Sequence, residues 1–181
     1  MEAIGESIGL ALRPVVGRSL IQSRRIVDLQ AFGFGEWIRR PAVGRKAPRF
    51  VDVPEFALHV QCRWRIVRDG SIVVGSADIF WPSSGSDVSY HDFDYDGKPS
   101  RRDELIDAFM THGSAAHVVA NIAGAPTGDA RVEFGDGCAL ELWPDHRKGD
   151  RPDGDGPHEH WRFFHERAPT HFVVTASGIE S

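Results

Sequence analysis

The chain has 181 residues, of which 41% are apolar and 26% are charged, and its formal net charge is −5. This size and composition are typical of a globular protein that buries roughly 70% of its unfolded surface without a disulfide or metal staple. No stretch approaches 18 consecutive apolar residues and only two cysteines are present, which excludes a membrane-spanning helix and a disulfide-rich scaffold.

The first half of the chain predicts short strands. Ile26–Phe34 has the composition of a strand that ends in glycines, and Trp37–Phe50 reads as a basic, proline-containing loop. From Phe56 to Val74 apolar and polar residues alternate with a period of two, and Asp69-Gly70 interrupts the pattern as a hairpin turn. Ile79–Pro82 closes a further predicted strand.

The second half begins with the main predicted helix, near residues 100–112. Ser100 is placed to cap it, Asp103 follows three residues later as in a capping box, and Gly113 ends it. Gly135-Asp136-Gly137 predicts a second hairpin, and residues 144–157 form a polar loop that we expect to be mobile. The remaining predicted strands are Val118–Ile122, Ala130–Phe134, Cys138–Trp143, Trp161–Phe164 and Phe172–Thr175.

Two stretches of the chain resemble each other, which suggests a duplicated β-meander. Ala57–Val60, Trp64–Val67 and Ile72–Val74 correspond in order to three later segments: Ala139–Leu142, Trp161–Phe164 and Phe172–Val174. Chance similarity between strands is the alternative. We therefore predict an α+β fold with a mainly antiparallel sheet, in one compact domain (1–181) with two related halves, about 1–97 and 98–181.

An acidic segment offers a calcium site. Asp92, Asp94, Asp96 and Gly97 match the D-x-D-x-D-G pattern, and Asp103 stands at position twelve. Pro99, the two arginines Arg101 and Arg102, and the lack of a leading helix argue against calcium. An acidic turn is therefore the alternative reading of residues 92–103.

Several histidines lie close together near the C-terminus, and imidazoles at i and i+2 can hold zinc if a third ligand arrives. These histidines are His158, His160 and His165, flanked by His146 and His171. No zinc-binding spacing such as CxxC or HExxH is present. We expect no cofactor, with calcium and zinc as the alternatives.

No motif of a nucleophilic enzyme, a phosphate-binding loop or a dinucleotide fold occurs in the sequence. We therefore expect a protein that is not an enzyme, with catalysis by residues from distant segments as the alternative. The N-terminus lacks the pattern of a signal peptide, and Cys62 and Cys138 lie within strand-like patterns. Both observations favour the cytoplasm, with two buried free thiols.

The charge is divided along the chain. Residues 1–68 carry 12 Lys/Arg and 6 Asp/Glu, a net charge of +6, whereas the remainder carries 9 and 20, a net charge of −11. An isoelectric point near 6.0 argues against nucleic acid as a partner. The strand with Arg63, Trp64 and Arg65 and the acidic Asp92–Asp96 segment are the predicted binding surfaces.

The strands "LHVQCRWRI" and "GSADIFWP", and "LELWPD" followed by a loop and "HWRFF", resemble segments of uncharacterised bacterial proteins, actinobacterial in type. The second set is also similar to small β-rich immunity proteins. The resemblance implies a β-rich fold and no catalytic residue or cofactor. We expect a protein–protein interaction module, with an immunity-like role as one form of it, whose partner is another protein or a second copy. A calcium- or small-ligand-binding protein that uses the acidic 92–103 loop is the alternative.

Overall fold

The structure is a computed structural model that describes residues 2–42, 49–96, 98–113, 117–145 and 158–180. It confirms the predicted α+β class, with mostly antiparallel strands. In chain order the helices and strands are α1 (Glu2–Leu12), β1 (Leu20–Ile26), β2 (Leu29–Pro41), β3 (Phe50–Val60), β4 (Arg63–Arg68), β5 (Ser71–Gly75), α2 (Arg101–Gly113), β6 (Val119–Gly124), β7 (Ala130–Phe134), β8 (Cys138–Trp143), β9 (Glu159–His165), β10 (Phe172–Thr175) and β11 (Gly178–Glu180).

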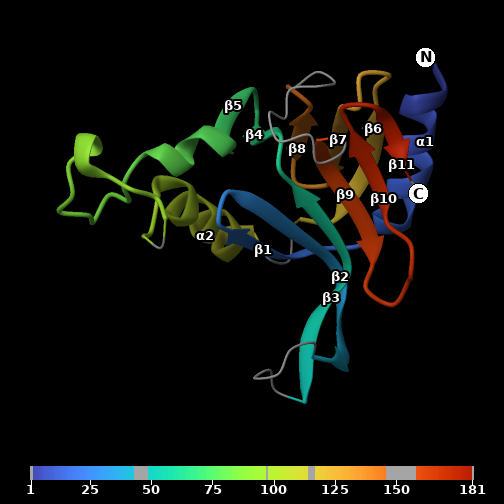
Figure 1. Ribbon diagram of the computed structural model, residues 1–181, viewed down its shortest axis with the longest axis horizontal. Helices are drawn as coiled ribbons and strands as arrows, with labels where there is room; N and C mark the ends of the chain where they lie inside the picture. Colours follow the sequence, from blue (N-terminus) through green and yellow to red (C-terminus); the bar gives the residue numbers. More distant parts are fainter. Residues whose placement is uncertain (1, 43–48, 97, 114–116, 146–157, 181) are drawn as a thin grey trace.

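The strands form two antiparallel sheets that enclose the core (Figure 1). One sheet has the order β1-β2-β3-β9-β10-β11, and the other has the order β5-β4-β8-β7-β6. Phe32 of the first sheet meets Trp64 of the second edge to face, with ring centroids 5.2 Å apart. The chain passes between the sheets after β3, where the amides of Gln61 and Cys62 both donate to the carbonyl of His160.

The sequence pattern explains why β4 lies where it does. Trp64 and Ile66 point into the core, whereas Arg63 and Arg65 lie on the outer face, as a period of two requires. The predicted Asp69-Gly70 turn joins β4 to β5. Both turn residues have positive φ, at 50° and 76°, as the favoured hairpin turns demand.

Two segments in the first sheet differ from the prediction in where the strands begin and end. A turn at Val27 and Asp28 divides the expected strand Ile26–Phe34 between β1 and β2, and Val27 has a φ of 58°. Trp37–Phe50 was expected as a loop, but β2 continues to Pro41 and β3 begins at Phe50. Cross-strand pairing, from Trp37 opposite Pro54 to Pro41 opposite Phe50, overrides the low strand propensity of this stretch.

Two further segments also differ from the prediction. Residues Ser76–Phe80 form the 3₁₀ helix η2 where a strand was expected, and the Asp78 carboxylate accepts a hydrogen bond from the Gly75 amide at 2.7 Å. Helix α1 was not predicted, although Ile4, Ile8 and Leu12 are spaced by four residues and pack on the core. From residue 146 onward, the predicted polar loop at 144–157 lies outside the described residues.

The two halves of the chain have the same order of elements, a helix followed by at least five strands. Each half places its first two strands in register around a β-bulge, between Leu20 and Gln22 in β1 and between Val119 and Asn121 in β6. Counted from these bulges, Arg25 and Gly124 occupy equivalent positions. The two halves meet at an isolated bridge between Ser19 and Val118, which are themselves equivalent.

The pairing between the halves follows the same correspondence. Leu58 lies opposite Phe163 in the first sheet, and their counterparts Leu140 and Ile66 lie opposite each other in the second. The third pair of matched segments, Ile72–Val74 and Phe172–Val174, departs from this correspondence. Val74 lies opposite Ile66, whose counterpart is Phe163, but Val174 lies opposite Trp161. The duplication stays a prediction, which the shared register of the other strands supports.

Candidate functional site

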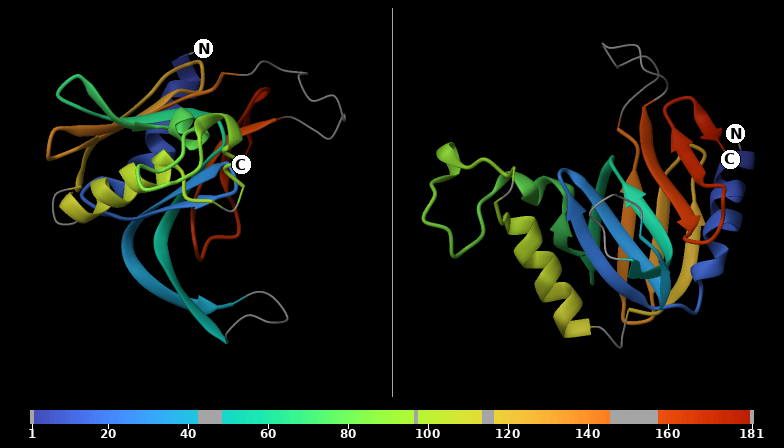
Figure 2. Two further views of the ribbon diagram at one scale, coloured as in Figure 1. Left: turned by 90° about the vertical axis from the view of Figure 1, so that its left-hand side faces the viewer. Right: turned by 60° about the horizontal axis from the view of Figure 1, so that its bottom comes forward.

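A long excursion of the chain between η2 and α2 projects from the two sheets (Figures 1 and 2). We call residues 80–99 the acidic arm. None of its described residues is buried. Its sequence holds four aspartates, against Lys98 as the only Lys or Arg: Asp87, Asp92, Asp94 and Asp96.

Large aromatic side chains lie on the surface of the acidic arm. Trp81 and Tyr90 stack with their ring centroids 4.4 Å apart, and each has about half of its surface exposed (52% and 51%). Phe80 meets Tyr95 edge to face at 5.7 Å. These pairs restrain the rings while leaving them accessible. Tyrosine and tryptophan in such settings are the residue types that dominate binding energy in protein interfaces.

The two ends of the acidic arm are joined at its base. Pro82 forms a bridge with Ser100, and the Arg101 amide donates to the Trp81 carbonyl at 2.7 Å. The amide and hydroxyl of Ser84 donate to the two oxygens of Glu104, at 2.9 and 2.5 Å. These bonds from Ser84, and then Arg101, lower the pKa of Glu104 to about 2. The arm is therefore a closed loop anchored on the first turn of α2.

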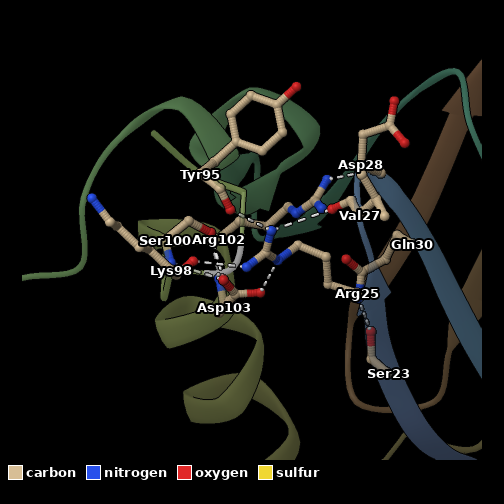
Figure 3. Close-up of polar contacts among 10 residues, drawn as sticks. All are labelled: Ser23, Arg25, Val27, Asp28, Gln30, Tyr95, Lys98, Ser100, Arg102 and Asp103. Atoms are coloured by element: carbon tan, nitrogen blue, oxygen red, sulfur yellow. Dashed lines mark hydrogen bonds and ion pairs between the residues drawn. The ribbon is translucent and has the colours of Figure 1, made fainter. Parts of the chain in front are cut away.

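A single arginine from β1 ties this base to the sheet (Figure 3). Arg25 Nε donates to Asp103 Oδ1 at 2.9 Å. Its Nη1 donates to the Tyr95 carbonyl at 2.9 Å and to the Val27 carbonyl at 3.3 Å, and its Nη2 donates to the Lys98 carbonyl at 2.8 Å. One guanidinium thus bonds to the arm, to the helix and to the β1–β2 turn.

The predicted cap of α2 is present and supports this arrangement. Asp103 Oδ2 accepts hydrogen bonds from both the amide and the hydroxyl of Ser100 at 2.8 Å, and the Asp103 amide donates to the Ser100 hydroxyl at 3.3 Å. Burial alone would raise the pKa of Asp103, but the bonds from Ser100 and Arg25 outweigh it and lower this pKa. Asp103 is therefore held as a carboxylate.

The structure does not bring the four predicted calcium ligands together. Asp92 accepts the Ser89 hydroxyl at 2.6 Å, and Asp94 accepts the Asp96 amide at 3.1 Å. Lys98 and Asp103 stand at positions seven and twelve of the predicted calcium loop, and both bind the Arg25 guanidinium. The cation in this loop is a side chain of the protein. Calcium binding stays a prediction that this geometry does not favour.

The predicted binding surface divides into two parts. Trp64 is 2% exposed and lies in the core, so it belongs to no outer surface. Arg63 pairs with Asp145 at 3.1 Å, and Arg65 pairs with Glu141 at 2.6 Å and lies over the Trp143 ring. Both arginines are already neutralised within the chain.

The histidines proposed for zinc are dispersed. The rings of His158 and His160 lie 5.7 Å apart, whereas His165 packs edge-on against Phe56 and His171 stacks on Phe164. His146 lies outside the described residues. The structure gives zinc at these positions no support.

One cluster of metal-ligating types was missed by sequence reasoning: His117, Asp136 and Cys138, whose ligand atoms lie within 4.8 Å of one another. His117 Nε2 is 3.2 Å from the Phe109 carbonyl and its Nδ1 is 2.8 Å from Asp136. Arg68 Nε donates to Cys138 Sγ at 3.0 Å, and burial raises the pKa of this thiol. A guanidinium on the sulfur and a protonated thiol both oppose metal binding.

The first half supplies a structural explanation for this cluster. There Glu55 lies 3.6 Å from Arg18 and 3.9 Å from His165. In both places one carboxylate therefore lies near an arginine and a histidine. We interpret the His117 cluster as a polar contact of the same kind, which serves the fold.

A second projection is the hairpin of β2 and β3, and we call residues 35–53 the basic arm (Figure 1). None of its described residues is buried. Trp37 is 52% exposed, and the guanidinium carbons of Arg39 and Arg49 lie 5.3 and 5.5 Å from the centre of the Phe50 ring. Its sequence holds five Lys or Arg residues against Glu36 and Asp52.

Comparison with known proteins returned no match to a family model, to a curated protein or to a solved structure. Among the described residues, no helix combines the length and the apolar character needed to cross a membrane.

Proposed function

We propose that the protein is an interaction module that associates with a second copy of itself, the acidic arm of one copy against the basic arm of the other. The observation that carries this proposal is that two projecting segments of one chain have opposite charge, and that each exposes aromatic rings. Sequence analysis placed the basic surface at Arg63 and Arg65. Their internal partners move the proposed surface to the basic arm.

The physical basis of the contact has two parts. Aspartates and arginines attract each other over distance and set the orientation, but exposed ion pairs add only about 0–1 kcal/mol each. Most of the affinity would come from burying Trp81 and Tyr90 against Trp37 and Phe50, whose surfaces are 40–52% exposed in the single chain. A two-fold pair in which each copy contributes both arms forms two such contacts and closes the assembly.

Sedimentation velocity of the purified protein tests the proposal. We expect a dimer that is tighter at about 0.01 M salt, where the Debye length is about 30 Å, than at about 1 M, where it is about 3 Å. Reversing charge on one arm (Asp87→Lys with Asp96→Lys, or Arg39→Glu with Arg49→Glu) should give monomers. Mixing these two variants should restore a dimer, because their arms are again complementary.

Exposed carboxylates away from both arms provide the control. Glu6→Lys with Glu180→Lys changes the net charge by the same amount as the aspartate variant and should leave the dimer intact. A monomer at all salt concentrations would contradict the proposal. A dimer that persists in both arm variants would place the interface elsewhere.

The proposal includes a cytoplasmic location, as expected from the sequence. Support comes from Cys62 and Cys138, which are both free and buried. Burial raises the pKa of the Cys62 thiol to about 12, so this side chain is an inert core residue.

A further inference from the structure

Arg102, in the first turn of α2, is a buried cation that is only partly hydrogen-bonded. It is 2% exposed, and its Nη1 donates to the Asp28 carbonyl at 3.1 Å (Figure 3). Its Nε and Nη2 have no hydrogen-bond partner among the described residues. Burial lowers the pKa of Arg102 to about 10, which leaves the guanidinium charged at neutral pH. A buried charge with two unpaired donors destabilises the protein unless something else binds it.

None of the neighbouring acids supplies that partner. Both oxygens of Asp103 are engaged, one with Arg25 and the other with Ser100. Asp78 accepts the Gly75 amide at 2.7 Å. The carboxylate of Asp28 points away from Arg102 in Figure 3, and only its backbone carbonyl is bonded. Arg25 lies nearby and adds a second positive charge, which also acts to lower the Arg102 pKa.

Arg102 lines a cavity of about 210 Å³ between the first turn of α2 and the crossing from β3 to β4. Its apolar wall consists of Cys62, Trp64 and Ile79, which are all buried, and the half-exposed Phe80. The Trp64 ring centre lies 6.0 Å from the Arg102 guanidinium carbon. This volume is smaller than the roughly 300 Å³ at which pockets for drug-sized ligands begin.

We propose that this cavity binds a small apolar monocarboxylate, whose two oxygens accept hydrogen bonds from Nε and Nη2 of Arg102 while its hydrocarbon part packs on Trp64 and Ile79. The Nε–Nη2 edge of a guanidinium matches a carboxylate in two parallel bonds. A phosphate or a dicarboxylate would bring further charge against apolar walls and against Asp28 and Asp145, which also line the cavity. The chemistry therefore selects one negative charge and an apolar remainder.

Benzoate, cyclohexanecarboxylate and hexanoate are suitable probes, with benzamide as the neutral counterpart of benzoate. Isothermal titration calorimetry of the full chain should show one site for at least one of the three acids, and benzamide should bind at least tenfold more weakly. Tryptophan fluorescence should change on binding, because Trp64 forms the wall of the cavity. No binding of any of the three acids would overturn the proposal.

Two variants assign the binding to Arg102. Arg102→Lys keeps the charge but loses the paired donors, so affinity should fall at least tenfold. Arg131→Lys is the matched control, because Arg131 lies outside this cavity and is paired with Glu133 and Glu141. Its affinity should remain within twofold. Equal loss in both variants, or no loss in Arg102→Lys, would place the carboxylate elsewhere.

The stability of the unliganded protein separates this role from a structural one. Arg102→Met fills similar volume and removes the unpaired charge, so its melting temperature should rise while binding of the acids is lost. A fall in melting temperature would show that Arg102 serves the fold, and would overturn the proposal. Because the arms are not changed, the dimer test is independent of this result.

Discussion

Helix α1 lies against β6, and helix α2 lies against β1 as well as β5 and η2, so each half supplies a helix that contacts the first strand of the other. The two contacts are made at equivalent positions in different ways. At β6 the backbones approach so closely that a Cβ on Gly124 would lie 2.5 Å from the Gly5 carbonyl oxygen. At β1 the equivalent residue is Arg25, which holds α2 through Asp103.

The two helices are therefore held in place by different means. The glycine contact holds α1 by close packing of the two backbones and supplies no side chain that could bond to another segment. The arginine contact fixes α2 by hydrogen bonds, and the same guanidinium also fastens the acidic arm through two backbone carbonyls. We call this contact between Arg25 and Asp103 the polar junction. Both the acidic arm and the Arg102 cavity lie beside it.

The largest effect is expected at the polar junction. Arg25→Ala removes four charge-assisted hydrogen bonds, two of them partly buried, and should lower the free energy of unfolding by about 3 kcal/mol in urea denaturation. Arg24→Ala is the control, since Arg24 is exposed on the same strand and should change stability by less than about 0.5 kcal/mol. Similar losses in both variants would contradict the role assigned to Arg25.

The close contact between Gly5 of α1 and Gly124 of β6 should show a smaller loss in the free energy of unfolding. A Cβ at Gly124 would also lie 2.7 Å from Ile8 Cβ, so Gly124→Ala should cost about 2 kcal/mol through overpacking. Gly9→Ala on α1 meets nothing within 4 Å and should stabilise the protein by about 0.5–1 kcal/mol. Thermal unfolding of the two variants checks both signs, and a stabilised Gly124→Ala would refute the close contact.

Acid should weaken the contacts of Asp103 and Glu104. Asp103 and Glu104 both have lowered pKa values in the folded protein, so their stabilising contribution is complete above their unfolded pKa values, near 3.8 and 4.5. It is lost as the pH falls through the folded values, about 2 for Glu104. The free energy of unfolding should therefore fall below about pH 4.5. Asp103→Asn with Glu104→Gln should flatten this dependence, and an unchanged profile would exclude the two carboxylates as its source.

The smallest effect concerns the outer faces of the sheets. Glu141 accepts hydrogen bonds from Arg65 and Arg131, whereas the equivalent residue His59 lies opposite Arg162, near Arg24, with its pKa lowered by burial and by Arg162. His59→Glu should raise the free energy of unfolding by about 0.5 kcal/mol, and Glu141→His should lower it similarly. Chemical denaturation at neutral pH measures both, and equal signs would disprove the comparison.

Local patterns in the sequence predicted the elements whose causes are local. Alternation placed β4, Asp69-Gly70 placed a turn with positive φ, and Ser100 with Asp103 placed the start of α2. Helix α1 was missed because Gly5 and Gly9 lower helix propensity, although one of these glycines is what permits its contact with β6.

The site depends on contacts that no local pattern encodes. Arg25 and Asp103 are 78 residues apart, and nothing near either residue indicates the other. The acidic spacing of residues 92–103 was read as a cation loop. The cation that fills it is a distant arginine, which only the sheet brings into place. Likewise, Trp64 shares its strand with exposed arginines, yet it faces the core and the Arg102 cavity.

The exchange of strands between halves has a consequence for synthesis. β3 pairs with β9, where Phe56 lies opposite His165, and β4 pairs with β8, where Arg63 lies opposite Trp143. The first member of each pair is synthesised long before the second. A ribosome must therefore release most of the second half before either sheet is complete. Contacts this distant along the chain slow folding, and until they form the edges of β3 and β4 remain open to pairing with other chains. Co-translational chaperones that shield nascent strands would matter more for this protein than for one whose halves close separately.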